Sequence, residues 1–103
     1  MPRQITAYSN PLVKQVRDLR DKKGRRELGR FLAEGLRILT EAREAGRLPA
    51  LIFYAAASGG HPLVRALVAE VEAAGGEAIE TTPDILSKLS GKDNPQAVVG
   101  VFD

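Results

Sequence analysis

The 103-residue chain contains no cysteine and a single histidine, His61. Without cysteine it can have no disulfide framework, no thiolate metal site and no cysteine nucleophile, and nothing points to an oxidising compartment. One histidine cannot assemble a metal site. His61 stands between Gly60 and Pro62 at an expected helix start, where a solvent-facing or capping role is predicted. The sequence therefore predicts no catalytic, metal-binding or cofactor-binding residue in this chain.

Long apolar runs and aromatic residues are also scarce. No stretch approaches the roughly 18 apolar residues that a membrane span requires, and the N-terminus lacks the apolar run of a signal peptide. We therefore expect a cytoplasmic protein without a membrane partner. The chain has two tyrosines and three phenylalanines, so base stacking is not expected to dominate any recognition of nucleic acid.

Charge is distributed unevenly along the chain. The formal net charge is only +2, but residues 1–47 hold 12 basic and 6 acidic side chains, whereas residues 48–103 hold 3 and 7. This asymmetry indicates one surface suited to a polyanion, and the acidic remainder limits indiscriminate binding to phosphates. An ordinary solvated surface is the alternative explanation.

Length and apolar patterning predict one domain over residues 1–103, because a chain of this size buries a single hydrophobic core. Helix starts with capping residues and short apolar runs alternate along the sequence in the order helix, then β-α-β-α-β-α-β. Such alternation places helices against a sheet. We expect an α/β fold, a three-layer α/β/α sandwich with a short, mostly parallel or mixed sheet of about four strands, and a monomeric isolated domain.

Two helices show clear stripes of apolar side chains. After the cap at Asn10, the spacing of Leu12, Val16 and Leu19 predicts a buried stripe, and a second stripe is predicted for the helix that begins at Pro62. That second stripe consists of Leu63, Leu67 and Val71. Strands are expected at residues 31–33, 50–55, 77–81 and 96–102.

The basic segment, residues 14–30, is the strongest functional signal in the residues themselves. It contains eight lysines and arginines, which makes it a candidate for phosphate contacts. Its last part, residues 22–30, has two glycines and Leu28 as its only apolar side chain, so a flexible or weakly helical surface segment is predicted. Arginine can hold phosphate with two parallel hydrogen bonds.

Three short motifs occur in order: Ser-Asn-Pro-Leu-Val-Lys at 9–14, Gly-Arg-Phe-Leu-Ala-Glu-Gly-Leu-Arg at 29–37, and Leu-Ser-Gly-Lys-Asp-Asn-Pro-Gln at 89–96. Together they resemble the N-terminal substrate-binding domain of the SpoU (TrmH-like) RNA 2′-O-ribose methyltransferases. The resemblance covers essentially the whole chain. It implies a ribosomal-protein-like RNA-binding fold, and a separate catalytic domain, absent from this chain, that carries the S-adenosylmethionine site.

The basic residues of the segment and of the second motif are the predicted RNA contacts, and polar residues of the motifs are possible supporting residues. The predicted contacts are Lys14, Arg17, Lys22, Lys23, Arg25, Arg26, Arg30 and Arg37. The possible supporting residues are Asn10, Glu34, Asn94 and Gln96. Helix capping explains Asn10 equally well, core packing explains Phe31, and Glu34 could pair with a nearby arginine.

The leading hypothesis is that the chain binds structured RNA, ribosomal more than transfer RNA and most of all large-subunit ribosomal RNA. A separate methyltransferase domain of the parent protein would then modify the RNA, so whether the protein is an enzyme is undecided by this chain. A free-standing RNA-binding protein of the ribosomal or kink-turn type is the first alternative. The second is a protein-interaction module that binds an acidic partner.

Overall fold

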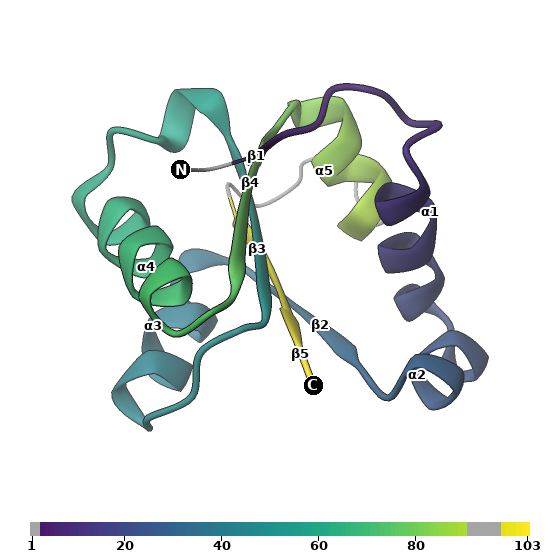
Figure 1. The fold of residues 1–103 in the computed structure, drawn as a ribbon, viewed down its shortest axis with the longest axis horizontal. Coiled ribbons are helices and arrows are strands. Elements are labelled where there is room, and N and C mark those ends of the chain that lie inside the picture. The colour runs from purple at the N-terminus through teal and green to yellow at the C-terminus, as the bar shows by residue number, and fades with distance from the viewer. Residues whose placement is uncertain (1–2, 91–97) are drawn as a thin grey trace.

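The computed structural model describes residues 3–90 and 98–103. These residues form a central sheet with helices on both faces (Figure 1). The strands are β1 (Arg3–Gln4), β2 (Phe31–Glu34), β3 (Leu51–Ala55), β4 (Glu77–Thr81) and β5 (Val98–Phe102). The helices are α1 (Pro11–Arg17), α2 (Lys22–Leu28), α3 (Leu36–Glu44), α4 (Pro62–Ala73) and α5 (Pro83–Ser90), with short 3₁₀ turns η1 (Asp18–Arg20) and η2 (Ala56–Ser58).

The sheet is mixed, with the strand order β1-β4-β3-β5-β2. β3 pairs in parallel with β4, and β4 with β1, whereas β5 is antiparallel to both β3 and β2. The predicted α/β class and the three layers are confirmed, and the described sheet has five strands where about four were expected. The additional strand, β1, has only two residues, and both are exposed and polar. Such a strand gives no apolar pattern to detect.

Each face of the sheet carries its own apolar core. α1, α2 and α5 lie on one side, and α3 and α4 on the other (Figure 1). Alternate residues of β3 serve the two sides: Phe53 joins the core beneath α1 and α5, and Ile52 joins the core beneath α3 and α4. Both side chains are fully buried. The five continuous apolar residues of β3 are therefore explained by burial on both faces.

The start of α1 confirms the predicted cap. The Asn10 side chain accepts a hydrogen bond from the Leu12 N–H at 2.9 Å, and Pro11 occupies the first helical position. The buried stripe differs slightly from the prediction, because Val13 is buried with Val16 and Leu19, whereas Leu12 is only partly buried. Beyond the helix, η1 turns the chain so that Leu19 still reaches the core.

In α4 the predicted stripe is confirmed at Leu67 and Val71 and differs at its first residue. Val64, Leu67 and Val71 are buried, while Leu63 is 41% exposed. Spacings of three and four residues both occur on one helix face, so the pattern allowed either choice. His61 caps this helix as predicted, because its Nδ1 accepts from the Leu63 N–H at 3.2 Å.

Residues 22–28 form an α-helix that is exposed except at Gly24, so the predicted surface position is confirmed and, of the two predicted conformations, the structure has the helical one. α2 ends at Gly29, whose φ of 66° is left-handed and suits a glycine at the helix end. Gly24 is buried within α2, and a Cβ atom placed there would lie 2.0 Å from the Asp18 carbonyl oxygen. This glycine therefore permits close packing of α2 on η1, and it does not indicate flexibility.

None of the helices in the described ranges is long and apolar enough to span a bilayer.

Candidate nucleic-acid interface

The charge asymmetry of the sequence becomes an asymmetry between the two helical layers. The continuous stretch from α1 to the end of α2, residues 11–28, carries seven basic and three acidic side chains. α3 and α4 together carry three basic and four acidic side chains. Because these layers lie on opposite faces of the sheet (Figure 1), positive charge is concentrated on the side formed by α1, η1 and α2.

Part of the basic segment surrounds a surface hollow of about 600 Å³. Lys14 and Arg17 contribute from α1, and Arg20 from η1. Two carboxylates, Asp18 and Asp21, share its border. The local charge is therefore positive but not uniform, which favours contacts with phosphates at particular positions over general adhesion to a polyanion.

Most predicted contacts in the basic segment are available to a ligand. Lys14, Arg17, Lys22 and Arg26 are exposed and make no ion pair with another residue in the described ranges. Lys23 lies 4.0 Å from Glu27, but its side chain is 85% exposed. A surface pair of this kind contributes little and exchanges easily for a phosphate.

Arg25 differs from its neighbour Arg26. Its Nη1 donates to the carbonyl oxygen of Leu19 at 3.1 Å and to that of Arg20 at 3.0 Å. These carbonyls belong to η1, so the Arg25 side chain satisfies acceptors that the short 3₁₀ turn leaves open. Arg25 therefore holds α2 against η1, whereas Arg26 makes no such hydrogen bond to a residue in the described ranges.

This difference gives a prediction for two adjacent arginines. Arg25→Gln should lower the free energy of unfolding by about 1–2 kcal/mol, because two charge-assisted bonds to backbone are lost. Arg26→Gln should leave stability within about 0.5 kcal/mol of the wild type. Urea denaturation of both variants measures the difference. Equal stabilities would show that the Arg25 bonds do not hold α2.

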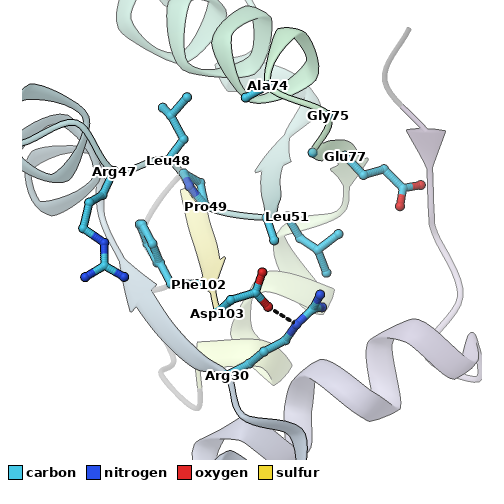
Figure 2. A pocket seen from close by; sticks show the side chains of 12 residues that line it. Arg30, Arg47, Leu48, Pro49, Leu51, Ala74, Gly75, Glu77, Phe102 and Asp103 are labelled. Atoms are coloured by element: carbon cyan, nitrogen blue, oxygen red, sulfur yellow. Dashed lines mark hydrogen bonds and ion pairs between the residues drawn. The ribbon is translucent and has the colours of Figure 1, made fainter.

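Arg30 directly precedes β2. It lines a hollow that also contains Phe102 and Asp103, at the end of β5 (Figure 2). Its Nε donates to Asp103 Oδ1 at 2.7 Å, and its side chain is 35% exposed. Figure 2 shows Arg47 in the same hollow, close to Phe102. Arg30 is thus partly committed to an ion pair, and its contact with RNA stays a prediction.

Arg37 lies on α3, in the layer opposite to α1 and α2 (Figure 1). Its side chain is 94% exposed, and its Nε lies 3.3 Å from Glu41. The structure therefore separates Arg37 from the predicted contacts on α1 and α2 by the thickness of the sheet. A ligand that covers the basic segment would have to extend around the domain to reach it.

The possible supporting residues have mixed outcomes. The structural explanation of Asn10 is confirmed by its cap. Glu34 ends β2 and borders a hollow that also contains Arg20, Arg25 and Ser90, so the expected pairing with an arginine is compatible with its position but stays a prediction. Asn94 and Gln96 lie outside the described residues.

The second and third motifs meet in that hollow, where Phe31 and Glu34 of β2 approach Ser90 at the end of α5. Arg20 links the same regions, since its Nη1 donates to the Lys88 carbonyl oxygen at 3.2 Å. Phe31 is 43% exposed and stacks on the buried Phe102 with 5.4 Å between ring centroids. The prediction that Phe31 is a core residue is therefore wrong, because β2 is an edge strand.

Sequence reasoning missed three residues of the basic layer. Arg20 belonged to the basic segment but was not among the predicted contacts, and neither were Tyr8 and Lys88. Lys88 Nζ lies 5.7 Å from the centroid of the Tyr8 ring. No local pattern joins residues so far apart in sequence, although an exposed tyrosine next to the Asn10 cap is a signal that could have been used.

The other tyrosine does not belong to this surface. Tyr54 is buried in the core beneath α3 and α4. Burial raises the pKa of its hydroxyl, with smaller contributions from the carboxylates of Glu80 and Glu72. The neutral side chain therefore serves packing, and the candidate interface remains on the opposite layer.

Comparison with known proteins identifies the domain. The family model described as the MRM3-like substrate binding domain matches residues 10–100. An uncharacterized tRNA/rRNA methyltransferase, slr1673 of Synechocystis, is 46% identical over 43 residues, which are 42% of this chain and 16% of that protein.

Solved structures agree with the family match. An rRNA methyltransferase from Sinorhizobium meliloti is 35% identical with a TM-score of 0.86, covering 98% of this chain and 36% of the other. The SpoU methyltransferase AviRb from Streptomyces viridochromogenes, in complex with AdoMet, is 27% identical with a TM-score of 0.71, covering 89% and 34%. The chain thus spans about a third of the length of these enzymes.

The matched region runs from the Asn10 cap to β5 and includes all of the basic segment. The fold, the order of the motifs and the solved neighbours agree with the resemblance seen in the sequence. The chain therefore belongs to the MRM3-like substrate binding domain family and has the fold of the substrate-binding domain of SpoU methyltransferases.

Proposed function

We propose that this domain binds structured RNA, specifically large-subunit ribosomal RNA, and presents a ribose to the catalytic domain of an RNA 2′-O-ribose methyltransferase. The observation that carries the proposal is the concentration of exposed basic side chains on α1, η1 and α2 of a family substrate-binding domain. The RNA would be met in the cytoplasm, and the isolated domain would act as a monomer.

Recognition would depend mainly on the RNA backbone. Phosphate contacts from the basic segment set the position and orientation of the RNA without reading its sequence. A-form RNA hides its base edges in a deep, narrow groove, so specificity comes from overall shape and from unpaired regions. The close packing of α2 on η1 fixes the spacing between Lys14 and Arg17 of α1 and Arg26 of α2, and that spacing selects RNA surfaces with matching phosphates.

Methyl transfer would take place on a separate domain of the parent protein. S-adenosylmethionine is bound in the AviRb structure, and in the parent protein of this chain it would be held by the catalytic domain. The contribution of this chain would be to bind and orient the RNA.

The proposal is tested by fluorescence anisotropy of the 103-residue chain with a labelled fragment of large-subunit ribosomal RNA and with a transfer RNA. Each titration is repeated at two salt concentrations. We expect tighter binding of the ribosomal fragment and an affinity that falls steeply with salt, because phosphate contacts release counterions. Absence of binding to either RNA at low salt would contradict the proposal.

Two other results of these titrations would change the proposed function. Equal affinity for both RNAs would contradict the ribosomal preference but retain the RNA-binding function. Indifference to RNA, with retained binding of an acidic protein partner, would support a protein-interaction module. Methylation of bound RNA only by a protein that contains both this domain and a catalytic domain would separate a substrate-binding role from that of a free-standing RNA-binding protein.

A further inference from the structure

Tyr8 is an exposed aromatic side chain that stacks on no other ring in the described residues. Phe53, Tyr54 and Phe102 are buried, and Phe31 stacks on Phe102. Tyr8 is 48% exposed and belongs to neither apolar core. An exposed ring beside a strongly basic region can stack on a ligand that has an aromatic face and a negative charge.

Three cations surround the Tyr8 ring. It borders a hollow of about 280 Å³ with Val13, Lys14, Arg17 and Lys88, and none of the lining residues is acidic. Lys88 reaches the ring from α5, and Lys14 and Arg17 come from successive turns of α1. This hollow differs from its neighbour on α1, where Asp18 and Asp21 offset the positive charge.

The loop that carries Tyr8 is fixed at both ends. On one side, the Ile5 N–H donates to the Glu80 carbonyl oxygen at 2.9 Å, and Thr81 Oγ1 donates to the Ile5 carbonyl oxygen at 2.7 Å. On the other side, the Asn10 N–H donates to the Ala7 carbonyl oxygen at 3.2 Å, next to the cap of α1. The backbone that carries the ring is thus held at both ends before a ligand arrives, which reduces the entropic cost of binding.

The chemistry of this hollow matches one unpaired nucleotide. A base can stack on an aromatic ring whatever its identity, and neighbouring cations bind the phosphates on either side. Its volume of about 280 Å³ is close to the lower limit of small-ligand pockets, about 300 Å³, so its size suits one base and not several. Lys88, which lies over the ring, can turn to a flanking phosphate when a base takes its position.

We propose that Tyr8, Lys14, Arg17 and Lys88 form a subsite for one unpaired nucleotide of the RNA, with its base stacked on Tyr8. This inference rests on the proposed function and adds a contact to a base where the basic segment supplies contacts to phosphates. It gives the domain a means to distinguish a loop or bulge from a continuous duplex, which phosphate contacts alone do not provide.

The test compares two labelled RNA hairpins with the same stem. One has an unpaired loop, and the other has the same loop with abasic nucleotides, which keep the phosphates and lack the bases. Tyr8→Ala should weaken binding of the first hairpin by about 5- to 100-fold and leave binding of the abasic hairpin at the wild-type value. Tyr8→Phe should retain more affinity than Tyr8→Leu, because only phenylalanine keeps an aromatic face.

Matched variants separate this subsite from the proposed function. Lys14→Gln should weaken both hairpins, and Arg65→Gln, an exposed arginine of α4 on the opposite layer, should weaken neither. If Tyr8→Ala binds the first hairpin like the wild type, or weakens both hairpins equally, the stacking subsite is wrong while RNA binding stands. If the wild type binds neither hairpin, both proposals are wrong. Circular dichroism checks that each variant is folded.

Discussion

Replacing Lys14, Arg17 and Arg26 by glutamate is expected to weaken RNA binding by about 100-fold or more at low salt. Each lost phosphate contact removes the gain from released counterions, and three contacts together amount to roughly two or more powers of ten. The new carboxylates also repel the backbone. These three side chains are exposed and have no ion pair with another described residue, so the substitutions should cost little stability.

The slope of affinity against salt gives a second measure of the same change. Loss of three phosphate contacts should reduce the slope of log K against log salt by about 3. Anisotropy titrations of the wild type and the triple variant at several salt concentrations provide both values. Arg65→Glu on α4 is the matched single-site control for Arg17→Glu, because both are exposed helical arginines and the charge change is identical.

The control decides between a local site and overall charge. If Arg65→Glu weakens binding as strongly as Arg17→Glu, net charge determines the affinity, and the assignment of the basic segment as the RNA-binding site is wrong. Arg37→Glu tests whether the RNA reaches the opposite layer, because Arg37 lies on the same layer as Arg65. A loss at Arg37 without a loss at Arg65 would mean that the RNA extends around the edge of the sheet.

The parts of the fold that could be predicted are those in which local sequence and tertiary structure agree. β3 is a continuous apolar run because it is buried on both faces, and α1 begins at Asn10 because its side chain accepts from the Leu12 N–H. Such features need only neighbouring residues. The position of β5 could not be predicted this way, because its insertion between β3 and β2 depends on pairing with Leu51–Tyr54 and Phe31–Glu34, far away in sequence.

The candidate site also has residues that the sequence predicted and residues that only the folded structure reveals. The basic segment was found because its charges are consecutive, but the sequence did not separate Arg25 from Arg26. That distinction depends on the carbonyl groups of η1, which become acceptors for Arg25 only after α2 has folded back on the turn. Tyr8 and Lys88 meet through the packing of α1 on α5, and no sequence period connects them.

Gly24 is the residue at which sequence and structure disagree most. Glycine among lysines and arginines is typical of a flexible loop, yet Gly24 lies inside α2 and faces η1. An alanine Cβ atom would stand 2.0 Å from the Asp18 carbonyl oxygen and 2.6 Å from the Asp18 carbonyl carbon. Because these are backbone atoms, no change of rotamer relieves the clash, and α2 or η1 must move.

Gly24→Ala should therefore lower the free energy of unfolding by about 1–3 kcal/mol, as overpacking of a filled site does. The gain in helix propensity, about 1 kcal/mol, opposes this cost and is too small to cancel a clash with rigid backbone. Displacement of α2 would also break the bonds from Arg25 to Leu19 and Arg20. RNA affinity should fall together with stability, since Lys22, Lys23 and Arg26 move with the helix.

Gly60→Ala is the matched control, because a Cβ atom at that position meets nothing within 4 Å and its backbone is not left-handed. Its unfolding free energy should remain within about 0.5 kcal/mol of the wild type. Urea denaturation measures stability, and anisotropy with the ribosomal fragment measures affinity. If Gly24→Ala instead stabilises the domain, propensity outweighs packing and α2 is held loosely on η1. The spacing of phosphate contacts would then be set by the RNA on binding, and not by the protein beforehand.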